Sequence, residues 1–296
     1  MKDEVAISFD GGKKSFHIKT RRTSYIIAVI DGFPAHVYYG KRIEGSPTLD
    51  HLMLSDIAFL QGNKGEEGSF RDMFPFEYPS EGKGDFRCTA LSVRNGSCLT
   101  GCDLKFKDYR ILDEKKPVKG MPSSHGDNVS SLELILSDTE GLIEVTLTYS
   151  AFVESDVITK SVVVKNTSEG DVILNRVMSS SLDIPYEDTK VISLPGSWAR
   201  ERMTESTPVG HGQIVLSSDR GTSSHQMNPA FAVANNDANE DTGSVWGLAL
   251  VYSGSFTARI ERTQFERVRI VAGISDNGFE WTLAPQEEFV SPEIAL

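Results

Sequence analysis

Alternation of apolar and polar residues is the feature that most restricts the fold of this chain. Residues 143–152 (IEVTLTYSAF) show it most clearly, with apolar side chains at every second position, Ile143, Val145, Leu147 and Tyr149. The residues between them are Glu, Thr, Thr and Ser. Successive Cβ atoms of a β-strand leave opposite faces of the sheet, so a period of two predicts a half-buried antiparallel strand.

Strand-like segments recur along the whole chain. We expect further strands at residues 6–9, 16–20, 24–30, 35–43, 89–94, 104–112, 131–137, 157–165, 172–184, 190–194, 213–216, 230–235, 245–253, 256–263, 267–273, 279–283 and 288–296. Turn signals such as Asp31-Gly32 and Asn95-Gly96 separate them. Only residues 49–59 could form one short helix. The sequence therefore predicts an all-β fold, a large antiparallel β-sandwich with few or no helices, and a single domain over residues 1–296.

The charge balance limits the partners that this chain can have. Its 30 Lys and Arg residues face 42 Asp and Glu residues, which gives a formal net charge of −12. Nucleic-acid binding depends on clustered cations, so we expect no nucleic-acid partner. We find no apolar run of membrane-spanning length and no signal-peptide pattern after Met1, and we therefore expect no membrane partner and a cytoplasmic location. The cysteines, Cys88, Cys98 and Cys102, have no nearby histidine, which favours free thiols over a zinc site.

Two long stretches break the strand pattern. The first, residues 44–87, is irregular but contains Phe59, Phe70, Phe74, Phe76 and Tyr78. This number of aromatic residues is too high for a disordered linker, and a long loop in a compact domain is usually functional. Two readings remain open: the loop packs on its own sandwich, or it inserts into a neighbouring surface.

The second irregular stretch, residues 193–231, is rich in Gly, Pro, Ser, Arg and His, and only residues 213–216 resemble a strand. It places Trp198 and Arg200 in one loop and His225 and Gln226 in another. Arg and amide side chains bond sugar hydroxyls and Trp stacks on sugar rings, but Trp and Arg are also enriched at protein interfaces. We favour an interface over a sugar pocket.

Motifs that would carry chemistry are missing from the sequence. We find no Gly-x-Ser-x-Gly, no phosphate-binding loop and no His-Glu-x-x-His. His225 could be grouped with Asp219 and Ser223 as a triad, but these residues are close in sequence and common in loops. We therefore assign no catalytic residue, no metal ligand and no cofactor to this chain.

Six segments, in order along the chain, resemble the N-terminal domain of glycoside hydrolase family 36 α-galactosidases. They are residues 76–90 (FEYPSEGKGDFRCTA), 157–161 (VITKS), 194–202 (LPGSWARER), 220–229 (RGTSSHQMNP), 251–256 (VYSGSF) and 291–294 (SPEI). The resemblance implies a supersandwich of the galactose-mutarotase-like kind that precedes a (β/α)8 catalytic barrel. It also implies hydrolysis of terminal α-D-galactose from melibiose- or raffinose-type oligosaccharides, with retention, by two aspartates of that barrel. We therefore expect this chain, which ends before any barrel motif, to be inactive alone.

The resemblance further implies partners and roles. These are the protein's own barrel, further copies in a homotetramer, and galactosides. A loop matching residues 46–51 reaches a neighbouring active site in tetrameric relatives, so we expect Asp50 to bind substrate there. Asp50 could instead cap the possible short helix, and no basic residue among residues 61–69 matches the family pattern. We expect Trp198, Arg200, His225 and Gln226 to pack at a domain or subunit interface.

Two other functions remain open on the sequence. The chain could be a stand-alone carbohydrate-binding module, since sandwiches often bind sugars, or a purely structural interaction domain. The first predicts affinity for galactosides without a barrel. The second predicts that loss of the Asp50 carboxylate leaves activity unchanged.

Overall fold

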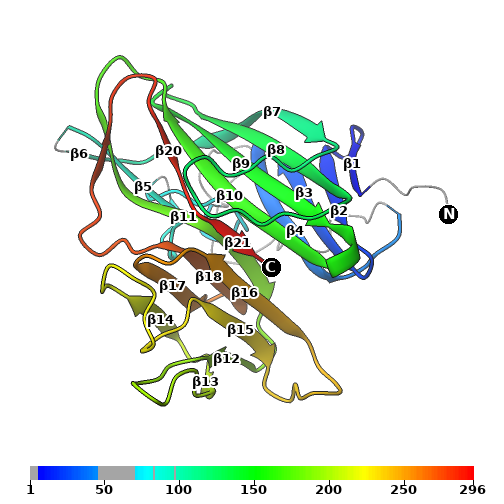
Figure 1. Cartoon of the computed structure of the whole chain (residues 1–296). Helices are drawn as coiled ribbons and strands as arrows, with labels where there is room; N and C mark the ends of the chain where they lie inside the picture. The colour runs from blue at the N-terminus through cyan, green and yellow to red at the C-terminus, as the bar shows by residue number, and fades with distance from the viewer. Residues whose placement is uncertain (1–5, 46–70, 83, 97) are drawn as a thin grey trace.

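The computed structural model describes residues 6–45, 71–82, 84–96 and 98–296. Within these ranges the chain forms 21 strands and one single-turn helix, η1 (Val153–Ser155). The prediction of an antiparallel all-β fold is confirmed, and Figure 1 shows the strands stacked as layered sheets. In the same ranges, no helix has both the length and the apolar character needed to cross a membrane. The possible helix at residues 49–59 lies outside the described residues.

The first sheet is a four-stranded antiparallel meander at the start of the chain. Its order is β1-β2-β3-β4. The strands are β1 (Ile7–Asp10), β2 (Ser15–Lys19), β3 (Thr23–Ile30) and β4 (Phe33–Lys41). This sheet lies on the upper part of the molecule in Figure 1 and packs beside β7 and β8 through rings such as Phe9, Phe16 and Tyr109.

The second sheet runs through the whole molecule in the order β13-β12-β15-β16-β21-β10-β9-β8-β7, with β20 also paired to β10. Its strands are β7 (Leu104–Leu112), β8 (Val129–Asp138), β9 (Ile143–Phe152), β10 (Val157–Asn166), β12 (Thr189–Ser193), β13 (Glu205–Pro208), β15 (Ala230–Asn235), β16 (Val245–Val251), β20 (Glu288–Val290) and β21 (Glu293–Ala295). The last strand of the chain therefore lies in the middle of this sheet and joins its two halves.

The third sheet faces the second, in the order β14-β17-β18-β11-β5-β6, with β19 paired to β11. Its strands are β5 (Leu91–Asn95), β6 (Cys98–Thr100), β11 (Val172–Pro185), β14 (Gly212–Ser218), β17 (Phe256–Arg262), β18 (Arg267–Ile274) and β19 (Trp281–Leu283). Figure 1 shows β12–β18 gathered in the lower part of the molecule, where two of these strands, β13 and β14, form sheet edges.

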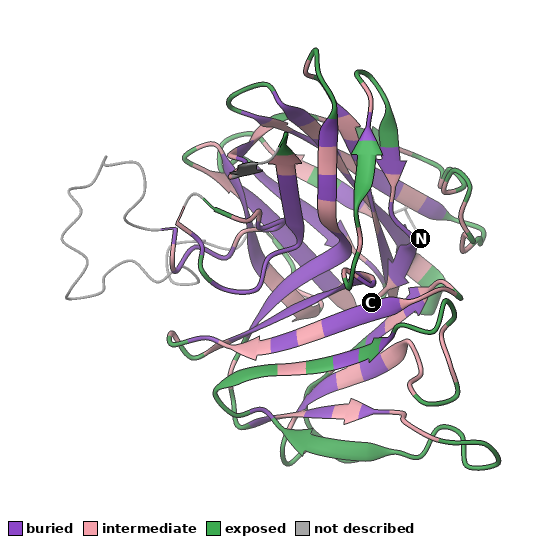
Figure 2. Ribbon diagram, turned by 90° about the vertical axis from the view of Figure 1, so that its left-hand side faces the viewer, coloured by how far each residue is buried: buried purple, intermediate pink, exposed green. Residues whose placement is uncertain are grey.

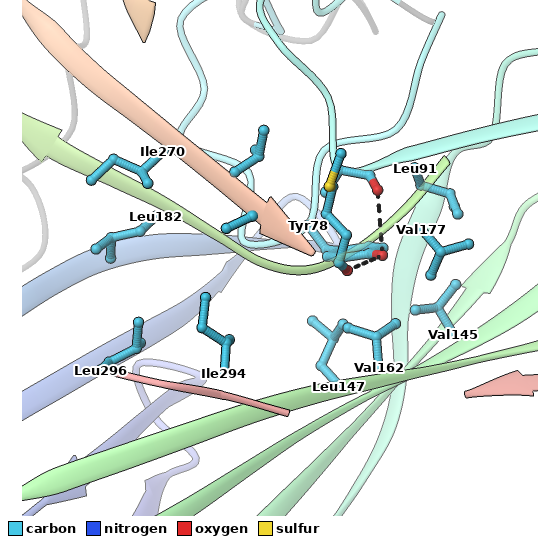
Figure 3. Packing of buried hydrophobic residues seen from close by; sticks show 14 of the residues in the cluster. Tyr78, Leu91, Val145, Leu147, Val162, Val177, Leu182, Ile270, Ile294 and Leu296 are labelled. Atoms are coloured by element: carbon cyan, nitrogen blue, oxygen red, sulfur yellow. Dashed lines mark hydrogen bonds between the residues drawn. The ribbon is translucent and has the colours of Figure 1, made fainter. Parts of the chain in front are cut away.

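The core lies between the second and third sheets. The alternating residues of β9 form part of this core: Ile143, Val145, Leu147 and Tyr149 are each at most 2% exposed. Figure 3 shows Val145 and Leu147 beside Val162 of β10 and, across the gap, the side chain of Val177. Burial of such side chains is the main favourable contribution to folding.

The strand predictions were wrong in three places. The strand β6 (Cys98–Thr100) was not predicted. Residues 288–296 form two strands, because Pro292 has no N–H to continue the ladder and the Ser291 hydroxyl accepts the Val162 N–H at 2.9 Å instead. The strand β13 was not predicted, since all four of its residues are exposed and show no alternation. Residues 71–82 and 84–87 pack on their own sandwich, with Phe74 and Tyr78 buried.

A buried carboxylate fastens this segment to the sandwich. Glu77 Oε1 accepts hydrogen bonds from the Tyr25 hydroxyl of β3 and the Tyr149 hydroxyl of β9, each at 2.6 Å, and from Lys160 Nζ of β10 at 2.8 Å. Lys160 Nζ also donates to the Ser181 carbonyl of β11 at 2.9 Å. We call Tyr25, Glu77, Tyr149 and Lys160 the Glu77 cluster. Lys160, itself in the second sheet, thus connects to Tyr25 of the first sheet and to Ser181 of the third.

Within the Glu77 cluster, the Glu77 carboxylate and the Lys160 ammonium each favour the charged form of the other. Burial by itself would raise the pKa of Glu77, but the nearby Lys160 ammonium and His36 outweigh burial and lower this pKa to about 2. Burial lowers the pKa of Lys160, and Glu77 opposes that shift. Burial, followed by the Glu77 charge, holds the pKa of Tyr25 and of Tyr149 well above its usual value. Both tyrosines therefore remain neutral donors.

Replacing Glu77 with Gln should lower the free energy of unfolding by about 3–5 kcal/mol, since it leaves the buried Lys160 charge unpaired. Urea unfolding measures this loss. The contribution of Glu77 also depends on pH. Its folded pKa lies below its ordinary value of 4.5, so the contribution is complete above about 4.5 and is lost as pH falls towards about 2. The Gln variant should lack this part of the acid sensitivity.

Glu144→Gln is the matched control, because Glu144 pairs at 2.7 Å with Lys107, whose side chain is 57% exposed. This change should cost less than about 1 kcal/mol. Equal losses in the two variants would contradict the role given to the Glu77 cluster.

Candidate functional site

Two loops lie side by side in the lower part of the molecule and form one surface. Residues 194–204 follow β12, and residues 219–229 connect β14 to β15. The Gly196 N–H donates to the Gln226 carbonyl and the Asn228 N–H to the Leu194 carbonyl, each at 3.2 Å. We call residues 194–204 and 219–229 the two-loop surface. Figure 2 shows a largely exposed strand at the bottom of the molecule, below strands that are partly buried, and β13 and most of β14 are exposed.

Glycine at position 196 is what lets the loops meet. A Cβ atom there would lie 2.6 Å from the Arg200 carbonyl oxygen and 2.9 Å from the His225 carbonyl oxygen. Real Cβ atoms do not approach backbone so closely. Ala199 and Arg202 have φ values of 61° and 58°, so the first loop turns tightly at two non-glycine residues. The loop shape is therefore set by backbone contacts.

The structure brings four of the predicted residues onto this surface. Trp198 is 85% exposed, and Arg200, His225 and Gln226 are also exposed. The Arg220 Nε donates to Gln226 Oε1 at 2.9 Å, which orients the amide. A large aromatic ring that stands in solvent on a fixed backbone is typical of an interface anchor. The fifth predicted residue, Asp50, and the loop at residues 46–51 lie outside the described residues.

Asp219, one member of the triad considered on the sequence, has other hydrogen-bond partners in the structure. The Asp219 carboxylate accepts hydrogen bonds from the Ser275 hydroxyl and from Asn277 Nδ2. In the ranges that the structure describes, no three His, Cys, Asp or Glu side chains are grouped so that they could hold a metal ion. The chemistry of the two-loop surface is that of contact: one exposed indole ring among Arg, His and amide groups.

Sequence reasoning missed the buried charges of the Glu77 cluster. Lys160 occupies an inward position of β10, in line with the apolar residues Ile158, Val162 and Val164. A lysine in that register needs a buried partner, so the alternation did contain a signal. Nothing in the sequence identified Glu77 as that partner, because the two residues are 83 positions apart.

Comparison with known proteins shows which family this chain resembles, and the family profile and the individual relatives agree. The family profile described as the glycosyl hydrolase family 36 N-terminal domain matches residues 32–284. The bifunctional alpha-galactosidase/sucrose kinase AgaSK of Mediterraneibacter gnavus is 37% identical over 99% of this chain and 32% of its own length. Alpha-galactosidase Mel36A of Lactobacillus acidophilus is 38% identical over 98% of this chain and 40% of its own length. The chain thus spans well under half of these relatives.

Solved structures of such proteins have the same fold as this chain. The galactosidase domain of AgaSK superimposes with a TM-score of 0.92 at 36% identity, over 98% of this chain and 41% of that one. Alpha-galactosidase AgaA A355E D548N of Geobacillus stearothermophilus, solved in complex with raffinose, gives 0.90 at 36% identity, over 95% of this chain and 40% of that one.

Gly196→Ala should separate the two loops and lower the free energy of unfolding by about 1–3 kcal/mol, since the new methyl group overlaps backbone that cannot give way. Urea unfolding measures the change. Gly210→Ala is the control, because a Cβ there meets no atom within 4 Å. The same stability in both variants would show that the loops do not depend on close contact at position 196.

Proposed function

This chain belongs to the N-terminal domain family of glycosyl hydrolase family 36, and we propose that it is the N-terminal domain of an α-galactosidase. Its similarity, along nearly its whole length, to proteins named alpha-galactosidases carries this proposal. The longer protein would remove terminal α-D-galactose from melibiose- or raffinose-type oligosaccharides. One aspartate would form a covalent galactosyl-enzyme and a second would act as acid and base. Both belong to a (β/α)8 barrel outside this chain.

We propose that this domain supports assembly of the enzyme and contributes a loop to a neighbouring active site. In this account, Trp198, Arg200, His225 and Gln226 pack against the barrel or another subunit of a homotetramer. The high exposure of Trp198 and the backbone contacts that fix both loops support this role. Asp50 would bind substrate hydroxyls in the neighbouring subunit.

A cytoplasmic location is part of the same proposal. Cys88 and Cys102 are buried free thiols. Free thiols are typical of proteins in reducing compartments.

The 296-residue chain should not hydrolyse a chromogenic α-galactoside, whereas the longer protein should. The reason is that the proposed catalytic aspartates lie outside the chain. The assay follows release of the chromophore from both proteins at equal concentration. Reproducible turnover by the folded 296-residue chain would contradict this placement of the chemistry. Calorimetric heat on adding melibiose to the chain alone would instead favour a carbohydrate-binding module.

In the longer protein, Asp50→Ala should lower kcat/KM for raffinose about 10- to 100-fold, since a hydrogen bond from a sugar hydroxyl to a charged carboxylate is worth about 1.5–3 kcal/mol. Steady-state kinetics measures the loss, with the mass in solution recorded for each variant. Asp113→Ala is the control, because Asp113 is an exposed carboxylate at the end of β7. Unchanged kinetics in an intact oligomer would reject the substrate contact and favour a purely structural domain.

A further inference from the structure

Glu293 is a buried carboxylate on β21, the last strand of the chain. It is 1% exposed, and the next residue, Ile294, belongs to the hydrophobic core. Successive side chains of a strand leave opposite faces, so Glu293 lies on the face of the second sheet that points away from the core. The residue opposite it on β16 is Val251, which carries no charge. A buried carboxylate in this position needs a cation and hydrogen-bond donors from outside the sheet.

The partners of Glu293 come from the long connection between β7 and β8. Lys115 Nζ lies 3.1 Å from Glu293 Oε1, and the two side chains are 7% and 2% exposed, so this ion pair is buried. The Ser124 N–H and hydroxyl donate to Glu293 Oε2 at 2.7 and 2.9 Å. We call residues 115–124 the strap. Its end at Ser124 is 169 positions from Glu293 in the sequence.

Polar contacts also close the strap on itself. Lys115 Nζ donates to the Ser123 hydroxyl at 2.8 Å, and the same oxygen accepts the Val118 N–H at 3.2 Å. A hollow of about 480 Å³ lies between the two arms of the connection. The arms therefore do not fill the space between them, and the contacts around Lys115 hold them together.

Glu293 is the point at which the strap is attached to the rest of the domain. Among the residues that the structure describes, each hydrogen bond or ion pair from the strap to another part of the chain ends on this carboxylate. A connection this long, without a helix or strand of its own, is uncommon in a compact domain and is usually functional. Loss of the Glu293 charge would leave Lys115 buried without its partner and would release the strap.

The strand under the strap is short for the place that it occupies. β21 has three residues, Glu293–Ala295, and lies between β16 and β10 in the middle of the second sheet. Only Ile294 and Ala295 pair with β10, opposite Lys160 and Thr159. The core covers one face of β21 through Ile294, and the strap covers the other through Glu293.

We propose that the strap closes over β21 as a clasp, and that strap and strand open and close as one unit. While the Lys115–Glu293 pair is made, the last strand stays in the sheet. Segments attached by few contacts open locally, at a free energy below that of global unfolding. The inference rests on the proposed function in one respect: in the longer protein, the clasp would fix the point at which the remaining domain joins this one.

Amide hydrogen exchange of the 296-residue chain tests the coupling between residues 115–124 and residues 293–296. Glu293→Gln keeps the size of the side chain but leaves the buried Lys115 charge unpaired. Exchange in both segments should become at least about 100-fold faster, while the core strand β9 stays protected. Lys115→Met should have the same effect. The double variant should exchange more slowly than the two single effects combined would predict, because neither charge remains.

Lys119→Met is the matched control, because Lys119 is an exposed lysine of the same strap, and it should change neither segment. Lys115→Arg keeps the charge and should stay close to the wild type. If Glu293→Gln does not fold, Ser124→Ala replaces it; this change removes one hydrogen bond to the carboxylate and should speed exchange in both segments about tenfold.

Unchanged exchange in both segments of the Glu293→Gln chain would overturn the proposal. Faster exchange of the strap alone would also overturn it, since the strand would then not depend on the strap. Purely additive effects in the double variant would show that Lys115 and Glu293 do not act as a pair. Hydrolysis of α-galactosides by the longer protein tests the proposed function separately, and its result does not depend on the outcome of the exchange experiment.

Discussion

One buried ion pair, between Glu77 and Lys160, joins the parts of this fold. Lys160 occupies an inward position of β10 and is 4% exposed, so its ammonium group needs a charged partner at that depth. Glu77 supplies it from an irregular segment, and the same oxygen accepts from Tyr25 of the first sheet and Tyr149 of the second. An ion in this position limits how the first sheet, the segment and the sandwich can be arranged, because any other arrangement leaves a charge unpaired.

The Glu77 cluster also affects the position of exposed residues. The Glu77 cluster holds the segment at residues 71–82, and Arg269 of β18 holds Asp85 a few residues later. Phe86 follows directly and is exposed between the buried residues Asp85 and Arg87. The two-loop surface is fixed in a different way, by backbone contacts that depend on Gly196. The molecule thus presents aromatic rings on rigid supports at two separate places, which suits a domain whose proposed role is to hold other domains and subunits together.

Alternation along the chain was enough to predict the fold class and most strands, since β9 and its neighbours are buried on one face. It failed for β13, whose residues Glu205, Ser206, Thr207 and Pro208 are all exposed, and it merged β20 with β21 across Pro292. The predicted residues Trp198 and His225 do share a surface. This surface depends on backbone hydrogen bonds between residues 30 or more positions apart, Gly196 with Gln226 and Leu194 with Asn228, and the Glu77 cluster depends on longer separations still. No local pattern encodes such contacts.

The central claim is that the two-loop surface is covered in the longer protein. Amide hydrogen exchange tests it directly, by comparing residues 194–204 and 219–229 in the 296-residue chain and in the longer protein. We predict slower exchange for both loops in the longer protein, with unchanged exchange in the core strand β9. Equal exchange rates for the two loops in both proteins would contradict the account, because the surface would then face solvent in the assembled enzyme.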